Sequence, residues 1–160
     1  MTQLLDRVFL DTNIYIIGAI DSQSYEAQVL DWLGFGESQP AIVEVIVSEE
    51  LTDQISRVSK RVKNKDWGGE LLARIWQKLN VRYVLLNLQD FSKLEAMGVI
   101  PREDIGVYLT AKAGQAQCFV SSNHKLVRAL ASSTGEFECL TPEEFAKKYI
   151  LSIDGFRPLK

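Results

Sequence analysis

Five short apolar runs, each bounded by polar residues or glycine, stand out along the chain and predict buried β-strands. Their apolar character is nearly continuous rather than alternating, which is typical of strands in a parallel sheet covered on both faces. The runs occupy residues 7–11, 41–47, 81–88, 117–121 and 137–140. The pattern therefore predicts a mostly parallel sheet of about five strands.

Between these runs, apolar residues recur three and four positions apart, which predicts helices. Ser48 is a favourable N-cap for a helix. Glu49 and Glu50 then fall in the first turn, where the helix dipole favours acids. Thr141 to Glu144 has the sequence of a capping box. Further helices are expected over residues 22–33, after Asp66 and Asp90, from Pro101 to Gly114, and over residues 123–131.

Strands separated by helices predict a three-layer α/β/α sandwich with the sheet in the middle. The chain has 160 residues, a length that fits one domain. No repeat, low-complexity tract or linker divides the sequence. A single domain is therefore expected over residues 1–150, followed by a C-terminal tail over residues 151–160.

The composition is that of an ordinary soluble globular protein, with 46% hydrophobic and 24% charged residues. No apolar stretch approaches the ~20 residues that a membrane span needs, and the first residues do not form a signal peptide. The expected location is therefore the cytosol, without a membrane partner. Cys118 and Cys139 are expected to be buried free thiols, and a zinc site is disfavoured because the chain has one histidine.

The net charge of −3 argues weakly against broad nonspecific binding of nucleic acid, but the chain contains one local basic run. This run is either the solvated end of a helix, where the dipole favours cations, or a patch that steers phosphates. Trp67 follows the run and is the better candidate for stacking on a base, whereas Trp76 is expected in the core. The run consists of Arg57, Lys60, Arg61, Lys63 and Lys65.

Four polar residues stand where predicted strands end or helices begin. Because ligands bind beyond the carboxyl ends of parallel strands, such residues can share one cleft. Clustered carboxylates repel one another and normally need a cation, and hard oxygen ligands suit Mg²⁺ or Mn²⁺. The four are Asp11 after the first strand, Asp53 and Asp104 near the starts of two helices, and Asn123 after the fourth strand.

Each of these residues also has a purely structural interpretation, because short polar side chains cap helices and acids stabilise their first turns. Asp11 or Asn13 can cap a helix that starts near Ile14. Asp53 and Asp104 can be ordinary helix acids, and Asn123 can be a plain N-cap.

Four short motifs occur in order along the chain. They are V-F-L-D-T-N at residues 8–13, V-S-E-E-L-T-D-Q-I at 47–55, P-R-E-D followed by V-Y-L-T-A within 101–111, and F-V-S-S-N-H-K-L at 119–126. In their order and spacing they resemble the motifs of PIN domains, the ribonuclease fold of many prokaryotic toxins and RNA-processing enzymes. The likeness covers about residues 7–145, and its first motif is the most specific.

The resemblance implies a role for each matching residue. Asp11 would be the principal metal ligand, Asp104 a second ligand, direct or through water, and Asp53 the acid that orients a metal-bound water. Glu50 competes with Asp53 for this last role from one turn earlier on the same helix. Asn123 would ligate through its amide oxygen without adding charge, at a position where many members have aspartate. Further candidates for the metal shell or for contacts with phosphate are Thr12, Asn13 and Ser121.

Two functions remain open on this basis. The first is a Mg²⁺- or Mn²⁺-dependent endoribonuclease, either the toxin of a toxin–antitoxin pair or a free-standing processing enzyme. The second is a catalytically weak or inactive PIN-like module that binds RNA or a partner protein, which Asn123 favours. Phosphatase chemistry is disfavoured because Asn13 stands where such enzymes have a second aspartate. RNA, an antitoxin protein and a second copy of the chain are the partners that the resemblance implies.

Overall fold

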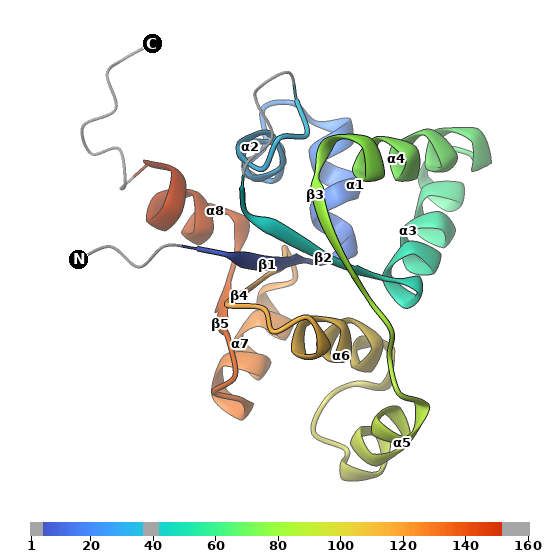
Figure 1. Cartoon of the computed structure of the whole chain (residues 1–160), viewed down its shortest axis with the longest axis vertical. Coiled ribbons are helices and arrows are strands. Elements are labelled where there is room, and N and C mark those ends of the chain that lie inside the picture. Colours follow the sequence, from blue (N-terminus) through green and yellow to red (C-terminus); the bar gives the residue numbers. More distant parts are fainter. Residues whose placement is uncertain (1–4, 37–41, 152–160) are drawn as a thin grey trace.

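The computed structural model describes residues 5–36 and 42–151, and these form a five-stranded parallel sheet with helices on both faces (Figure 1). The strand order is β3-β2-β1-β4-β5. The order reverses between β1 and β4, and open α/β sheets bind ligands at such a reversal, beyond the carboxyl ends of the strands. The strands are β1 (Arg7–Leu10), β2 (Glu44–Ser48), β3 (Asn80–Val84), β4 (Cys118–Val120) and β5 (Glu138–Leu140).

The helices form the two outer layers of the predicted α/β/α sandwich (Figure 1). One layer contains α1 (Thr12–Ile20), α2 (Tyr25–Trp32), α3 (Glu49–Val62), α4 (Lys65–Lys78) and α8 (Pro142–Phe145), which continues as a π-helical segment over Ala146–Leu151. The other contains α5 (Leu88–Met97), α6 (Ile105–Ala113), preceded by a 3₁₀ turn at Arg102–Asp104, and α7 (His124–Ser133). Of the helices described, none is both long enough and apolar enough to cross a membrane.

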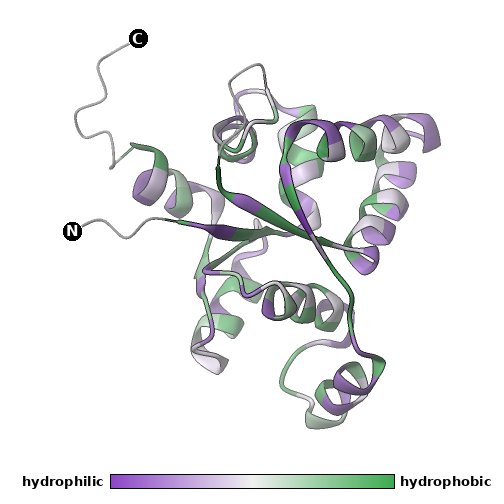
Figure 2. Cartoon of the chain, in the orientation of Figure 1, coloured by the Kyte–Doolittle hydropathy of each residue, from purple (hydrophilic) through white to green (hydrophobic). Residues whose placement is uncertain are grey.

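The strands are mostly hydrophobic, whereas the helices carry both hydrophobic and hydrophilic residues (Figure 2). The buried positions of α3 include Leu51 and Ile55, four residues apart on one side of the helix. The aromatic centre of the core joins β1 to β4, because Phe9 stacks on Phe119 with ring centroids 5.0 Å apart. Phe119 in turn stacks on Phe137 at 5.7 Å. This packing fixes the positions of the two strand ends that flank the topological reversal.

Several predicted helix starts agree with the structure. Ser48 caps α3 through a bond from Leu51 N at 3.2 Å, and Thr141 and Glu144 form the expected capping box. Asp11, rather than Asn13, caps α1. Gly114 ends α6 as expected, but this helix begins at Ile105 because a 3₁₀ turn follows Pro101.

Two helices begin slightly earlier than predicted. The helix expected to be capped by Asp66 is α4, which Asn64 caps by accepting a bond from Trp67 N at 2.8 Å, and the helix expected after Asp90 is α5, which Asn87 caps. Both aspartates lie in the first turn, where an acid stabilises the helix through its dipole and so gives a sequence signal close to that of a cap.

Two strands are shorter than predicted, and two side chains are more exposed than predicted. β2 begins at Glu44 rather than at residue 41, which lies outside the described residues, and β3 ends at Val84 rather than at residue 88. Cys118 is a buried free thiol, whereas the free thiol of Cys139 is only partly buried. Trp76 is 49% exposed and not in the core, because it packs on Tyr83 of the edge strand β3, which is itself 45% exposed.

Candidate functional site

Asp11 lies at the carboxyl end of β1, in the middle of the sheet, and is only 7% exposed. Its Oδ1 accepts a hydrogen bond from Thr12 N at 2.8 Å, and its Oδ2 accepts one from Ser121 Oγ at 2.7 Å. Burial raises the pKa of the Asp11 carboxyl, although these two hydrogen bonds act in the opposite direction. A nearby cation would therefore stabilise the ionised form of this buried carboxylate.

Ser121 is the fully buried residue that ties the ends of β1 and β4 together. Besides donating to Asp11, its hydroxyl oxygen accepts bonds from Asn123 N at 3.1 Å and from Asn13 Nδ2 at 3.4 Å. Asn13 Oδ1 accepts a further bond from Ser122 N at 3.0 Å. This network sets the orientation of the Asp11 carboxylate.

Replacing Ser121 with alanine is expected to lower the free energy of unfolding by about 1 kcal/mol, because a buried carboxylate loses a donor and two groups lose an acceptor. Urea unfolding monitored by tryptophan fluorescence measures the change. Ser132→Ala is the matched control, since that exposed hydroxyl bonds only to carbonyls of its own helix. Equal stability of the two variants would contradict the role assigned to Ser121.

Asp104 lies near Asp11. It is at the end of the 3₁₀ turn that leads into α6, in the helix layer that contains α5 and α7. Burial raises the pKa of its carboxyl to about 6, and the charges of Asp11 and Glu103 add to the effect. Asp11 and Asp104 therefore lie close enough to repel one another. No lysine or arginine of the described residues forms an ion pair with either of them.

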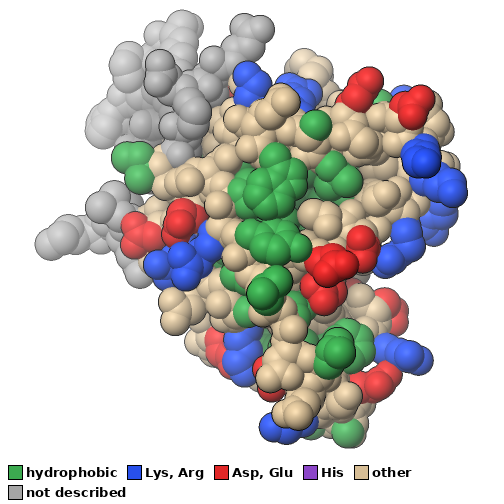
Figure 3. Space-filling view, turned by 45° about the vertical axis from the view of Figure 1, so that its right-hand side comes forward, with side chains coloured by type: hydrophobic (Ala, Val, Ile, Leu, Met, Phe, Trp, Pro, Cys, Tyr) green, Lys and Arg blue, Asp and Glu red, His purple; other side chains and the backbone are tan. Residues whose placement is uncertain are grey.

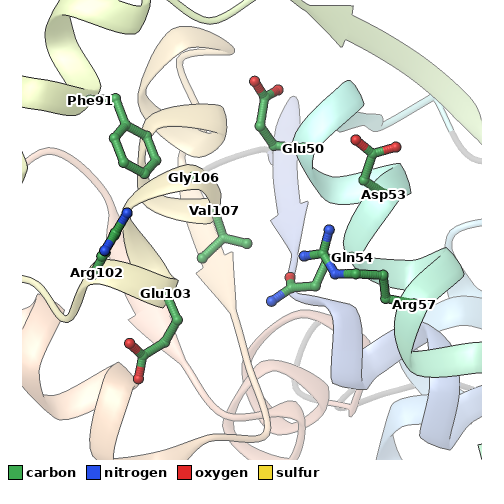
Figure 4. A pocket seen from close by; sticks show the side chains of 9 residues that line it. All are labelled: Glu50, Asp53, Gln54, Arg57, Phe91, Arg102, Glu103, Gly106 and Val107. Carbon is green, nitrogen blue, oxygen red and sulfur yellow. The ribbon is translucent and has the colours of Figure 1, made fainter. Parts of the chain in front are cut away.

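Gln54, rather than Asp53, is the α3 side chain that contacts this centre. Its Oε1 accepts a hydrogen bond from the Thr12 hydroxyl, one residue beyond Asp11. Asp53 is exposed, and in Figure 4 its carboxylate stands near that of Glu50 while the Gln54 amide points elsewhere in the cleft. The prediction from the sequence considered acids at this position and therefore missed the neutral amide of Gln54, next to Asp53.

The Asn123 side chain is used as a helix cap. Its Oδ1 accepts a bond from Leu126 N at 3.1 Å, at the start of α7, and the residue is exposed. Within residues 5–36 and 42–151, no group of three or more His, Cys, Asp or Glu is placed to hold a metal ion. The structure thus places Asp11 and Asp104 close enough to interact, but neither Asp53 nor Asn123 completes a metal-binding group with them.

A cleft of about 250 Å³ opens between α3 and the start of α6 (Figure 4). Gln54 links it to the Asp11 centre, and Glu103 and Gly106 flank Asp104 on its other wall. Arg57 and Arg102 contribute cations and Phe91 an aromatic ring. The remaining lining residues are Glu50, Asp53 and Val107.

Arg57 is the member of the basic run that lines this cleft. All five basic residues are exposed along α3 and at the start of α4: Arg57, Lys60, Arg61, Lys63 and Lys65. Trp67 is half-buried and packs against the core, so its ring is only partly available to a ligand.

A divalent cation fits the chemistry of the Asp11–Asp104 pair. Mg²⁺ in proteins is often held by only one or two carboxylates, with waters and substrate phosphates completing its shell. The pair supplies those two carboxylates, and among the described residues no lysine or arginine forms an ion pair with either of them. The Asn123 amide is less suited to this role because its oxygen already caps α7.

The sheet order and the three layers define a PIN-like α/β fold, and the sequence predicted this fold class. The chain is similar to VapBC2 from Rickettsia felis bound to a DNA fragment from their promoter, with 16% identity, a TM-score of 0.56, and coverage of 84% of this chain and 96% of that chain. It is also similar to VapBC-1 from nontypeable Haemophilus influenzae, with 17% identity, a TM-score of 0.54, and coverage of 79% and 93%. No protein-family model and no curated protein matches the sequence.

Proposed function

We propose that the protein is a Mg²⁺- or Mn²⁺-dependent endoribonuclease of the PIN type. The observation that carries this proposal is the pair of carboxyls, Asp11 and Asp104, which lie close enough for their charges to repel near the topological reversal of the sheet and which no described lysine or arginine pairs with. The likeness of the fold to VapBC toxin–antitoxin structures supports the same class.

In this proposal Asp11, at the end of β1, and Asp104, at the start of α6, would hold the cation. A bound divalent cation supplies a water of lowered pKa and stabilises charge on the phosphoryl oxygens. Ser121 keeps the Asp11 carboxylate in place, and Gln54 fixes the Thr12 hydroxyl beside it. Arg57 and Arg102 line the adjoining cleft, where they favour binding of the RNA backbone.

The acids on the cleft rim have a second role in the proposal. Asp53 and Glu50 lie within reach of water in the cleft, where either carboxylate can accept a proton from the attacking water. The other basic residues, Lys60, Arg61, Lys63 and Lys65, extend the positive surface along α3 and onto α4. Trp67 adds a partly exposed ring for stacking.

Cleavage of a fluorescently labelled single-stranded RNA tests the proposal. We expect cutting that requires Mn²⁺ or Mg²⁺ and falls to the no-enzyme rate with excess EDTA. The readout is the appearance of shorter labelled fragments on a denaturing gel. Absence of any metal-dependent cleavage across a panel of RNA sequences would contradict the proposal.

A second function has its own supporting observation. In the described part of the chain no third acid joins Asp11 and Asp104 in a metal-binding group, and the neighbouring Gln54 and Asn123 side chains are neutral amides. A site of this low charge fits a PIN-like module that binds RNA or a partner protein with little catalysis. Binding of RNA without cleavage, with affinity unchanged by EDTA, would favour this alternative.

The partners follow from the same proposal. Proteins that share the fold are found in VapBC toxin–antitoxin complexes, so we propose RNA as the substrate and an antitoxin protein as a regulator in the cytoplasm. Homodimerisation is proposed on the same resemblance. Co-expression with the product of an adjacent small reading frame, followed by purification, tests for the regulator.

A further inference from the structure

Apolar side chains gather in a stripe over the exposed edge of the sheet at β3 (Figure 3). Tyr83 and Leu85 are 45% and 82% exposed and lie two positions apart, which places them on one side of an extended chain. Trp76 packs against Tyr83 with ring centroids 5.6 Å apart, and Leu88 continues the surface at 79% exposure. These four residues are called the β3 apolar stripe below.

The backbone of β3 is open on its outer side. β3 is the edge strand and pairs only with β2. In the described part of the chain, no other backbone segment bonds to it. Edge strands are usually protected by lysine, proline or a bulge. The one charged residue of β3, Arg82, is half-buried and lies 3.8 Å from Glu44, so it does not block the edge.

Acidic side chains lie at the carboxyl end of this edge. Ser48 is paired with Val84 in the sheet, so α3 begins next to the end of β3. Its first turns carry Glu49, Glu50 and Asp53, and none of these forms an ion pair with another described residue. Figure 3 shows acidic side chains clustered beside the apolar stripe.

We propose that the β3 edge binds an extended peptide segment of another protein, which adds to the sheet as a sixth strand. The open backbone groups accept the strand, and the β3 apolar stripe accepts apolar side chains at every second position. The acids of α3 select lysine or arginine at the end of the segment that lies beside them. This inference goes beyond the proposed nuclease activity, since the open edge of β3 and its apolar stripe take no part in that activity, and only the acids Glu50 and Asp53 belong to both.

A peptide is favoured over a second copy of the chain as the occupant. Pairing β3 with its own copy about a two-fold axis through the middle of the strand would place Arg82 opposite Arg82. Like charges at directly opposite positions destabilise a strand pair. A lysine-bearing segment meets the acids without this cost.

The test uses a fluorescein-labelled peptide of alternating valine and threonine with a lysine pair at each end, and a matched peptide with glutamate pairs. Fluorescence anisotropy with the full chain should show about tenfold tighter binding of the lysine peptide. Leu85→Lys should weaken that binding by about tenfold. Met97→Lys, which changes an exposed apolar residue at the far end of α5, is the matched control and should leave it unchanged.

Charge reversal makes the test sharper. Glu49→Lys combined with Asp53→Lys should reverse the preference, so that the glutamate peptide binds better. Thermal unfolding checks that each variant is folded. Equal affinity for both peptides, no binding of either at about 1 mM, or unchanged binding of a peptide N-methylated on its pairing edge would overturn the proposal. Self-association of the chain that Leu85→Lys abolishes would also overturn it, in favour of a second copy.

Discussion

Asp11→Asn is expected to reduce Mn²⁺-dependent RNA cleavage by at least about 100-fold, because the proposed cation loses its central ligand. Both oxygens of Asp11 accept hydrogen bonds, from Thr12 N and from Ser121 Oγ. An amide keeps only one acceptor oxygen, so the variant loses the charge and also misorients the remaining ligand. Initial rates at saturating Mn²⁺ measure the effect.

The fold of this variant should persist. Burial raises the pKa of Asp11, so the neutral amide removes a buried charge whose desolvation is unfavourable. Asp66→Asn makes the same chemical change at an exposed position in the first turn of α4 and should keep full activity. Equal cleavage by the wild type and Asp11→Asn would identify the activity as a contaminant and remove the basis of the metal site.

Asp104→Asn is expected to stabilise the metal-free protein at pH 8 by about 2 kcal/mol, a discounted value because the carboxyl is partly solvated. The folded pKa of about 6 lies above the ordinary value of 3.8. The folded state therefore binds the proton more tightly than the unfolded state does. The wild type accordingly loses stability as the pH rises from 3.8 through about 6, whereas the variant does not.

Urea unfolding in EDTA at pH 8 and at pH 4 measures this difference, which should be large at pH 8 and small at pH 4. Excess Mn²⁺ should reverse the order at pH 8, because a ligand present at 100 times its Kd stabilises the folded protein by about 2.7 kcal/mol. Glu103→Gln, next in the chain and exposed, is the control and should show a much smaller change. The same stability difference at both pH values would contradict the raised pKa of Asp104.

The sequence predicted the fold well because its strands are short buried runs and its helix starts carry strong caps. Asp11 could be found because an apolar run ends abruptly in a carboxylate. The order of the strands was harder to predict, since no feature of the local sequence indicates that β3 lies at the edge of the sheet. For that reason Trp76 was expected in the core, although its helical spacing was recognised correctly.

Gln54 could not be chosen over Asp53 from the sequence alone. Successive residues of a helix point about 100° apart, so one position decides between the centre of a cleft and its rim. The start of α3 is polar at positions 49, 50, 53 and 54, and such a run does not determine which side faces the neighbouring helix. The importance of Ser121 was also hard to predict, because its hydrogen bond to Asp11 depends on the pairing of β1 with β4.

The most direct test of the proposed metal site is anomalous diffraction at the manganese edge from a crystal grown with Mn²⁺. We expect one strong anomalous peak between the carboxylates of Asp11 and Asp104, with Ser121 still bonded to Asp11. A peak that lies only elsewhere on the protein, or no peak at saturating Mn²⁺, would contradict the proposed site.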